Sequence, residues 1–256
     1  MAQCDNGGGR GRLYLVGTGP GSAKHLTGAA VKALQEAEVI VGYRTYLDLI
    51  PEFLEGKAVV SSQMKKEVDR CRTSLDLAAE GKKVALVSGG DPGIYAMAGL
   101  VFEMAGKEKA PPEIDVVPGI AALNACAARL GAPLMHDFAS VSLSDLLTPW
   151  ETIEKRLEAS ARADFVLVIY NPRSKSRSEH IVRAREILLN HRSPETPVGL
   201  VTAVTRENER VVVTNLEQML DQEIGMQTTV IIGNSMTYQW QDLMITPRGY
   251  SSKYSW

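Results

Sequence analysis

The chain has few of the features that mark secreted, membrane-bound or metal-binding proteins. Its 256 residues include three cysteines, Cys4, Cys71 and Cys126, which lie far apart and form no Cys-x-x-Cys pair. Neither a disulfide framework nor a zinc site is expected, so we predict reduced, structural thiols and no metal. No apolar run approaches the roughly 18 residues of a membrane span. The start of the chain also has no basic segment or hydrophobic stretch, so we expect a cytoplasmic protein without a membrane partner.

An excess of positive charge is also missing. The 28 Lys and Arg residues are balanced by 30 Asp and Glu residues, which gives a net charge of −2 and an isoelectric point near 6.1. Nucleic acids and anionic lipids attract basic surfaces, so neither is an expected partner. The length allows one large domain or two small ones, and either can bury a sizeable core.

Strands and helices alternate in the first half of the chain. This rhythm predicts a parallel sheet with right-handed crossovers. Residues 1–11 form a Gly-rich tail that we predict to be disordered, and the Pro118-Gly119 turn sets the end of the first lobe, 12–118. The predicted strands are 12–17, 38–42, 57–60, 83–88 and 113–117, and the predicted helices lie near 26–37, 65–80 and 94–106.

The second lobe, residues 119–256, has a less regular pattern. Two of its strands, 197–203 and 210–214, are separated by a short polar segment and predict an antiparallel hairpin, so we expect a mixed sheet. The other predicted strands lie near 139–143, 164–170 and 228–232, and the helices near 120–130, 150–162 and 177–190. We find no internal repeat.

The loop Ser88-Gly-Gly-Asp-Pro-Gly93 follows one of the buried strands. Its glycines can adopt positive φ and present bare N–H and C=O groups to a ligand, and Asp91 is its only charge. The simpler interpretation is an ordinary strand-to-helix connection in which Asp91 caps a helix that begins near Ile94.

A second glycine loop, Gly17-Thr-Gly-Pro-Gly21, precedes an amphipathic helix that Thr27 can cap. It departs from the dinucleotide fingerprint G-x-G-x-x-G, because Ser22 is at the sixth position and Pro20 at the fourth. The acidic residues that follow, Glu38 and Asp48, are poorly placed to bind a ribose. A nicotinamide or flavin site is therefore not expected.

Longer blocks carry a resemblance to a known family. From about residue 12 to 250 the chain resembles the tetrapyrrole methylases, and within them the branch that methylates C17 of precorrin-3B or cobalt-factor III. The first two glycine loops look like the whole family, whereas Gly-Tyr-Arg-Thr-Tyr, Leu-Ser-Asp-Leu-Leu-Thr-Pro-Trp and Tyr-Asn-Pro-Arg-Ser-Lys look like this branch. The blocks are Val41–Leu49, Gly90–Tyr95, Val117–Asn124, Gly131–Phe138, Ser142–Trp150, Tyr170–Lys175 and Ile231–Ser235.

The resemblance implies a two-lobed α/β fold, with a mainly parallel N-terminal sheet, a mixed C-terminal sheet and a cofactor cleft between the lobes. The cofactor would be S-adenosyl-L-methionine, with S-adenosyl-L-homocysteine as product. Ala121 stands where much of the family has Thr, so that threonine's hydrogen bond to the cofactor is not expected here. Helix packing is the simpler role for Ala121 and Ala122. The matching cofactor positions are Pro20, Gly89, Gly90, Asp91, Ile94, Ala121, Ala122, Asn171, Ala203 and Val204.

Methyl transfer from a sulfonium needs aligned reactants and exclusion of water rather than a nucleophilic side chain or a metal. The resemblance also implies contraction of the macrocycle, which moves protons. His136, Asp137 and Asp145 are the candidates for general acid or base work. The alternatives are a hydrogen-bonded loop residue for His136 and a helix cap for Asp145.

A precorrin carries acetate and propionate groups, so its site needs cationic partners. We expect Arg44, Arg173 and Lys175 to bind the substrate, although solvated charges are the ordinary alternative. The resemblance also suggests a homodimer, for which the segment Met236–Trp240 and Trp256 offer aromatic contacts.

Two further functions stay open. The same fold could methylate a different acceptor, such as another corrin carbon, uroporphyrinogen or a ribose of ribosomal RNA, although the weak basic charge argues against RNA. A non-catalytic carrier of a tetrapyrrole or nucleotide would bind its ligand without turnover.

Overall fold

The structure is a computed structural model that describes residues 11–63 and 66–255. Cys4, Trp256 and all but the last residue of the predicted tail lie outside the described residues. The chain divides into two compact units, Met1–Ala122 and Leu123–Trp256, which are described separately. The sequence predicts this boundary near residue 118.

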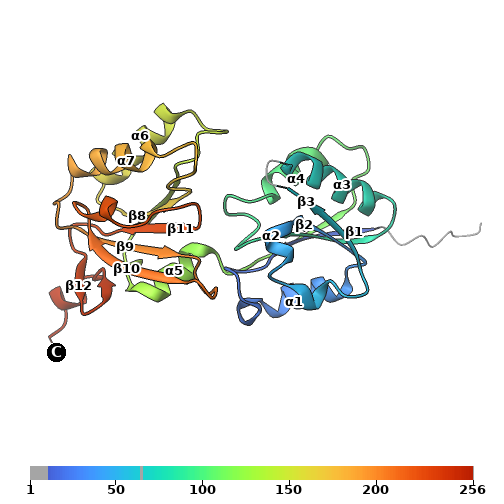
Figure 1. Cartoon of the computed structure of the whole chain (residues 1–256), viewed down its shortest axis with the longest axis horizontal. Helices are drawn as coiled ribbons and strands as arrows, with labels where there is room; N and C mark the ends of the chain where they lie inside the picture. Colours follow the sequence, from blue (N-terminus) through green and yellow to red (C-terminus); the bar gives the residue numbers. More distant parts are fainter. Residues whose placement is uncertain (1–10, 64–65, 256) are drawn as a thin grey trace, which may run out of the picture. The chain divides into compact units, whose positions relative to one another are not determined.

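The first unit contains a five-stranded sheet (Figure 1). Its strands follow the order β3-β2-β4-β1-β5. All neighbouring strands are parallel, as predicted. The four apolar residues Val84–Val87 of the central strand are fully buried, which explains their continuous apolar run. The strands are β1 (Arg12–Gly17), β2 (Val39–Tyr43), β3 (Ala58–Ser62), β4 (Lys83–Ser88) and β5 (Glu113–Val117).

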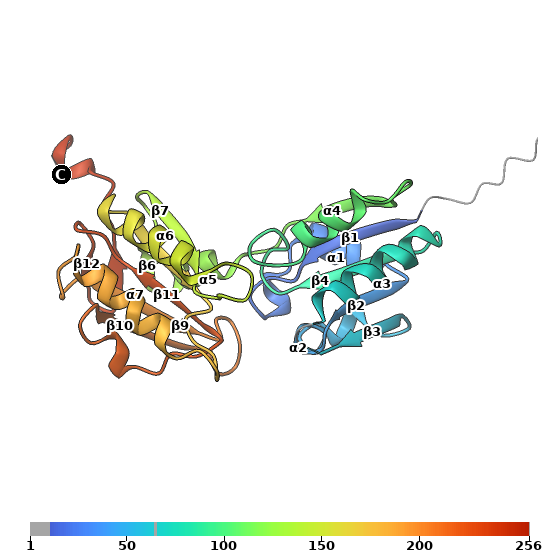
Figure 2. The same cartoon turned by 90° about the horizontal axis from the view of Figure 1, so that it is seen from above.

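Helices cover both faces of this sheet (Figures 1 and 2). Helix α1 (Gly28–Glu36) packs Ala30, Ala33 and Leu34 against one face, and Thr27 caps it by accepting a hydrogen bond from the Ala30 N–H. Helices α3 (Glu67–Ala79) and α4 (Ala98–Ala105) cover the other face. The short elements are α2 (Arg44–Leu47) and the 3₁₀ turns Ala23–His25 and Pro51–Phe53.

Helix α4 begins four residues later than the sequence predicts. The segment after Asp91 forms turns, with Tyr95 at φ +53°, and the residue that precedes the helix is Met97. The interpretation of Asp91 as the cap of this helix is therefore wrong. The positive φ of Tyr95 is incompatible with a right-handed helix, so α4 starts only after it, at Ala98.

The second unit has a mixed sheet in the order β10-β9-β11-β8-β7. The β7–β8 pair is parallel and the other pairs are antiparallel, including the predicted β9–β10 hairpin. The predictions of a mixed sheet and of a hairpin are both confirmed. The strands are β7 (Phe138–Ser142), β8 (Val166–Tyr170), β9 (Pro197–Thr202), β10 (Arg210–Asn215) and β11 (Thr228–Ile232).

Helices α6 (Trp150–Arg162) and α7 (Glu179–Leu189) cover one face of this sheet, and α5 (Ala122–Leu130) the other (Figure 1). Gly199 of β9 allows α5 to approach closely, because a Cβ there would lie 2.3 Å from Leu130 Cδ1. A small sheet of β6 (Gly131–Ala132), β13 (Leu243–Ile245) and β12 (Tyr238–Trp240) was not predicted, since its strands are too short for a sequence pattern. The 3₁₀ turns are Met219–Asp221 and Tyr250–Ser252.

Candidate functional site

Three glycine-containing loops meet at the carboxyl edge of the first sheet, after β1, β4 and β5. Gly19 and Gly90 form a reciprocal pair of backbone hydrogen bonds, with N to O distances of 3.1 and 2.7 Å. A Cβ on Gly119 would lie 2.1 Å from the Gly90 oxygen, and one on Gly17 would lie 2.6 Å from the Gly119 nitrogen. The three backbones touch only because these positions have no side chain. We call this contact the glycine junction (Gly17, Gly19, Gly90 and Gly119).

Asp91 joins two of these loops. Its Oδ1 accepts a hydrogen bond from the Gly93 N–H at 2.8 Å, and its Oδ2 accepts one from the Gly119 N–H at 3.1 Å. The expectation that Gly90 presents a bare N–H is wrong, because the Gly19 oxygen accepts a hydrogen bond from it. The Gly90 oxygen accepts one hydrogen bond, from the Gly19 N–H, and like each oxygen of Asp91 it keeps a lone pair.

The other cofactor positions predicted in the first unit surround the same junction. A Cβ on Gly90 would lie 3.7 Å from both Ala121 Cα and Ala122 N. Ala121 is buried, while Ala122 is half-buried. The remaining predicted positions are Pro20, which is buried, and Gly89 and Ile94, which are half-buried.

Arg44 is exposed and begins α2 directly after β2, at the same carboxyl edge. Gly89 lets this helix approach the junction, because a Cβ on Gly89 would lie 2.6 Å from the Tyr46 ring. The chain leaves β1 toward α1 and leaves the neighbouring β4 toward α4, on opposite faces of the sheet. Open α/β sheets bind ligands at such a divergence, outside the carboxyl ends of the strands.

In the second unit, β7, β8 and β9 run in the same direction, because β11 is antiparallel to both β8 and β9. Their carboxyl ends therefore lie at one edge. Asp145 follows β7, Asn171 follows β8, and Ala203 and Val204 follow β9. Asn171 and Ala203 have φ of +51° and +50°. Strained backbone of this kind clusters at functional positions.

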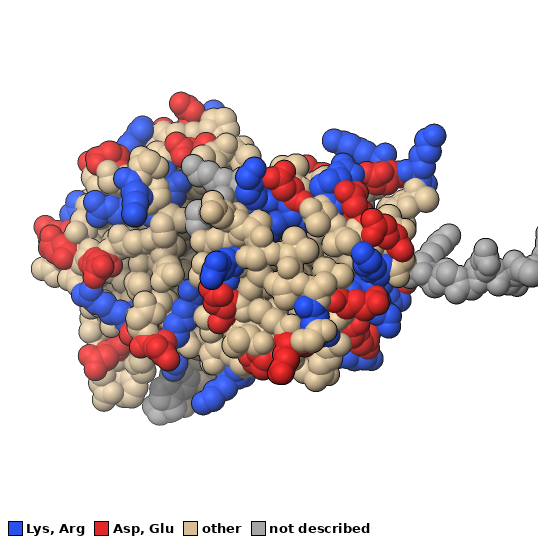
Figure 3. All heavy atoms as spheres, turned by 45° about the vertical axis from the view of Figure 1, so that its right-hand side comes forward, with Lys and Arg blue, Asp and Glu red and all other residues tan. Residues whose placement is uncertain are grey.

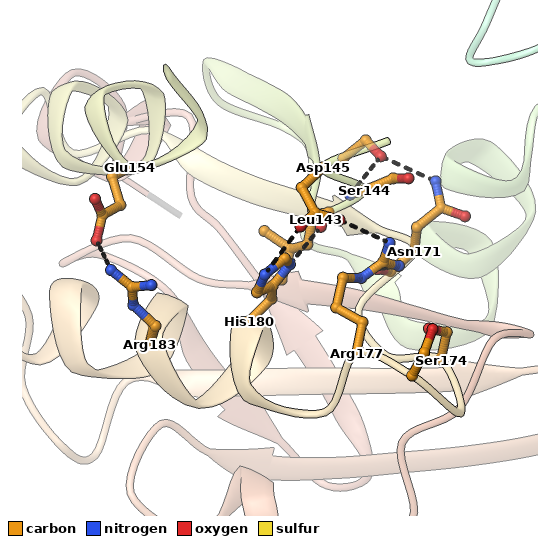
Figure 4. A network of polar contacts seen from close by, with 11 residues as sticks. Leu143, Ser144, Asp145, Glu154, Asn171, Ser174, Arg177, His180 and Arg183 are labelled. Atoms are coloured by element: carbon orange, nitrogen blue, oxygen red, sulfur yellow. Dashed lines mark hydrogen bonds and ion pairs between the residues drawn. The ribbon is translucent and has the colours of Figure 1, made fainter. Parts of the chain in front are cut away.

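Asp145 forms the centre of a polar network at this edge (Figure 4). Its carboxylate lies 3.8 Å from Arg177 Nη1 and 3.5 Å from His180 Nε2. Arg177 also donates a hydrogen bond to the Asn171 backbone oxygen at 2.9 Å, and Asn171 Nδ2 donates one to Ser142 Oγ at 2.9 Å. The network thus joins a predicted cofactor residue to a predicted acid or base.

His180 was missed by the sequence reasoning. It lies 35 positions after Asp145, and no motif or period relates the two. Arg177 precedes α7 (Glu179–Leu189) and His180 lies in its first turn, so no helical spacing in the sequence relates the two side chains.

His136 and Asp137 lie elsewhere. They precede β7, whereas Asp145 follows it, so the five-residue strand separates them by roughly 17 Å. The His136 Nδ1 accepts a hydrogen bond from the Asp137 N–H at 2.8 Å, and both side chains are substantially exposed. Arg173 and Lys175 are exposed on the loop after β8, at the same edge as Asp145.

Cys71 and Cys126 are free and buried, as predicted. Burial raises the pKa of each thiol to about 11.

Among the described residues, no group of His, Cys, Asp and Glu side chains could hold a metal ion. No helix in the described ranges is long and apolar enough to cross a membrane. Basic and acidic side chains intermingle on the face shown in Figure 3.

Residues 12–220 match the family of tetrapyrrole (corrin/porphyrin) methylases. The chain belongs to this family. The tetrapyrrole methylases use S-adenosylmethionine, so the chain is an S-adenosylmethionine-dependent methyltransferase.

Individual relatives agree with this membership. The chain is 52% identical over 250 residues to the cobalt-factor III methyltransferase of Priestia megaterium, covering 96% of this chain and 46% of that protein. It thus spans about half the length of that relative. It is 48% identical over 239 residues to a probable cobalt-factor III C(17)-methyltransferase of Salmonella typhimurium, covering 93% of this chain and 99% of that protein. The crystal structure of the methyltransferase CobJ superposes with a TM-score of 0.85 and 39% identity, covering 93% of this chain and all of the other.

Proposed function

We propose that this tetrapyrrole methylase transfers a methyl group to C17 of precorrin-3B or cobalt-factor III and contracts the ring to (cobalt-)precorrin-4, in cobalamin biosynthesis. The observation that carries the proposal is the location of the three blocks that resemble this branch. Residues 44–46, 143–149 and 171–175 of these blocks follow the carboxyl ends of β2, β7 and β8. These are ligand-binding positions of a sheet rather than its core, so the resemblance lies in the residues that would contact substrate.

The residues at these edges fit S-adenosylmethionine. Asp91 has carboxylate lone pairs for its hydroxyl or amino donors, and small residues leave room for the adenosyl group. When bound, this cofactor supplies a methyl group whose bond to sulfur breaks as a carbon of the tetrapyrrole donates an electron pair, so that S-adenosylhomocysteine leaves. The proposed contacts are Pro20, Gly89, Gly90, Asp91, Ile94, Ala121, Ala122, Asn171, Ala203 and Val204.

Ring contraction requires a group that can move protons. Of the three candidates, Asp145 is favoured because it shares its edge with Asn171, Arg173 and Lys175. His136 stays a prediction together with its neighbour Asp137. We propose Arg44, Arg173 and Lys175 as partners of the substrate carboxylates, and their exposure is consistent with that role.

The proposal is tested by incubation with isotopically labelled S-adenosylmethionine and either precorrin-3B or cobalt-factor III, followed by the product mass. One labelled methyl group on one of the two substrates is expected, and the preferred substrate shows whether cobalt is present before methylation. Binding of both ligands without incorporation of label would instead support a carrier.

We further propose that the protein is a homodimer that acts in the cytoplasm. Tyr238 and Trp240 of β12 are 50% and 56% exposed, and Met236 beside them is 60% exposed, which makes this strand a suitable contact surface. Light scattering that reports a mass near the monomer value of 27.8 kDa at micromolar concentration would contradict the dimer. Cell fractionation would test the location.

A further inference from the structure

The loop between β7 and α6 exposes two large apolar side chains. Leu146 is 72% exposed and Leu147 is 98% exposed. Each leucine gives up about 1.5–3 kcal/mol that burial would provide. Large exposed apolar patches occur at binding sites, so two adjacent exposed leucines make this loop a candidate contact surface.

Both ends of this loop are fixed. Leu143 is fully buried, and its N–H donates a hydrogen bond to the Tyr170 oxygen at 2.9 Å. At the other end, Trp150 begins α6 and stacks on the His180 ring, with 4.3 Å between the ring centroids and 28° between the planes. Arg183 lies over the same Trp150 ring at 4.7 Å, and Glu154 pairs with Arg183 at 2.8 Å.

His180 contacts the loop at three points, of which Figure 4 shows those at Leu143 and Asp145. Its Nδ1 lies 2.9 Å from the Leu143 oxygen, which accepts a hydrogen bond from it. Its Nε2 faces Asp145, and its ring faces Trp150. The side chains of His180 and Arg177 are only 14% and 11% exposed, so these contacts are held inside the unit while the two leucines stay outside.

The neighbouring loop after β8 carries exposed cations. β7 and β8 are paired in register from Phe138–Val166 to Ser142–Tyr170, so the two loops start side by side. Arg173 and Lys175 are exposed on the second loop. An apolar pair beside two cations suits a flat apolar ring with carboxylates at its rim, and suits neither an uncharged lipid nor a polyanion without an apolar face.

We propose that Leu146 and Leu147 form the seat for the apolar face of the tetrapyrrole, and that His180 and Arg177 are positioning residues that hold this seat in place. The proposal rests on the proposed function, because it takes a tetrapyrrole as substrate. His180 acts through Asp145 and Leu143 and not on the reacting atoms.

The seat is tested with the double variant Leu146→Ser/Leu147→Ser in the full chain. The KM for the tetrapyrrole should rise by about tenfold or more, because two apolar contacts are lost. The kcat and the S-adenosylmethionine affinity should change less than about threefold. Val68→Ser is the matched control, since Val68 is 59% exposed on α3 of the other unit, and it should leave all three quantities unchanged. An unchanged KM overturns the proposal, and so does a double variant that changes from dimer to monomer in light scattering.

The positioning role is tested at His180. His180→Ala should raise the tetrapyrrole KM by about tenfold, and kcat per folded enzyme should fall as well, because His180 also faces the Asp145 carboxylate. His180→Gln keeps an N–H in the place of Nε2, and His180→Asn keeps one in the place of Nδ1, so each should recover part of the loss. A merely structural role would instead lower kcat through loss of folded enzyme while KM stays the same, and that result contradicts the proposal.

The activity of the wild-type protein distinguishes a failure of this proposal from a failure of the proposed function. If it methylates neither substrate, the proposed function fails, and the dissociation constant of cobalt-factor III then replaces KM in the same comparison. A double variant that binds cobalt-factor III as tightly as the wild type overturns the seat, whereas weaker binding supports it. A wild type that does not bind cobalt-factor III contradicts both.

Discussion

The two units differ in how their candidate ligand-binding edges are held together. In the first unit, backbone atoms of four glycines touch, and Asp91 provides one carboxylate that joins the loops. In the second unit, the edge is held by side chains, with Asp145, Arg177 and His180 in one network. A backbone junction tolerates almost no added atom, whereas a side-chain network can lose one member and keep its fold. The first arrangement suits a ligand common to a whole family, and the second suits a substrate that differs among its branches.

The largest expected effect is at the glycine junction. Gly119→Ala places a Cβ 2.1 Å from the Gly90 oxygen, so the first unit should lose about 3 kcal/mol or more of stability. S-adenosylmethionine affinity should fall with it. Thermal unfolding and calorimetry measure the two effects. The control is Gly99→Ala in α4, where nothing lies within 4 Å, and this variant should be neutral or stabilise by up to about 1 kcal/mol. Equal effects of the two variants would show that the junction is not close-packed.

Arg173→Ala should separate the two ligands. Loss of a charge-assisted contact costs about 1.5–3 kcal/mol, so tetrapyrrole affinity should fall roughly ten- to a hundredfold. S-adenosylmethionine affinity should change less than about threefold. Titration of both ligands into both proteins decides this. Equal damage to both ligands would mean that Arg173 does not face the substrate.

Among the described residues, each unit buries one thiol, Cys71 in the first and Cys126 in the second, and these thiols make the stability of the protein depend on pH. Burial raises the pKa of Cys71 and Cys126 to about 11. Below the pKa of the thiols in the unfolded chain, the folded and unfolded proteins both keep the thiol protons, and the free energy of unfolding has its full value. As pH rises from about 9 to about 11, the unfolded thiols ionise first and stability falls. Urea unfolding at pH 8 and pH 10 should show a smaller loss for Cys71→Ala/Cys126→Ala than for the wild type, and an equal loss would contradict the assignment.

The smallest expected effect is at a strained position of the second unit. Ala203 has φ +50°, so Ala203→Gly should relieve strain and stabilise the unit by at most about 1 kcal/mol. Chemical denaturation measures the gain. A loss of stability would show that the packing of the Ala203 methyl group stabilises the unit by more than the strained backbone destabilises it.

Much of this architecture could be predicted from the sequence, because apolar runs and glycine loops are local signals. The parallel sheet, the hairpin and the Thr27 cap are confirmed. The late start of α4 was not predicted, since the apolar residues from Ile94 continue the helical pattern through a segment that forms turns. The pairing of Asp145 with His180 could not be predicted either, because it depends on α7 packing beside the loop after β7. The reciprocal pairing of Gly19 and Gly90 was missed for the same reason: it depends on the order of the strands.

The position of the transferred methyl group tests the central claim most directly. We would use S-adenosylmethionine with a ¹³C-labelled methyl group, the preferred tetrapyrrole substrate and a ¹³C NMR spectrum of the isolated product. The account predicts a single labelled methyl group on C17 of a contracted ring. A label on any other ring carbon would contradict it.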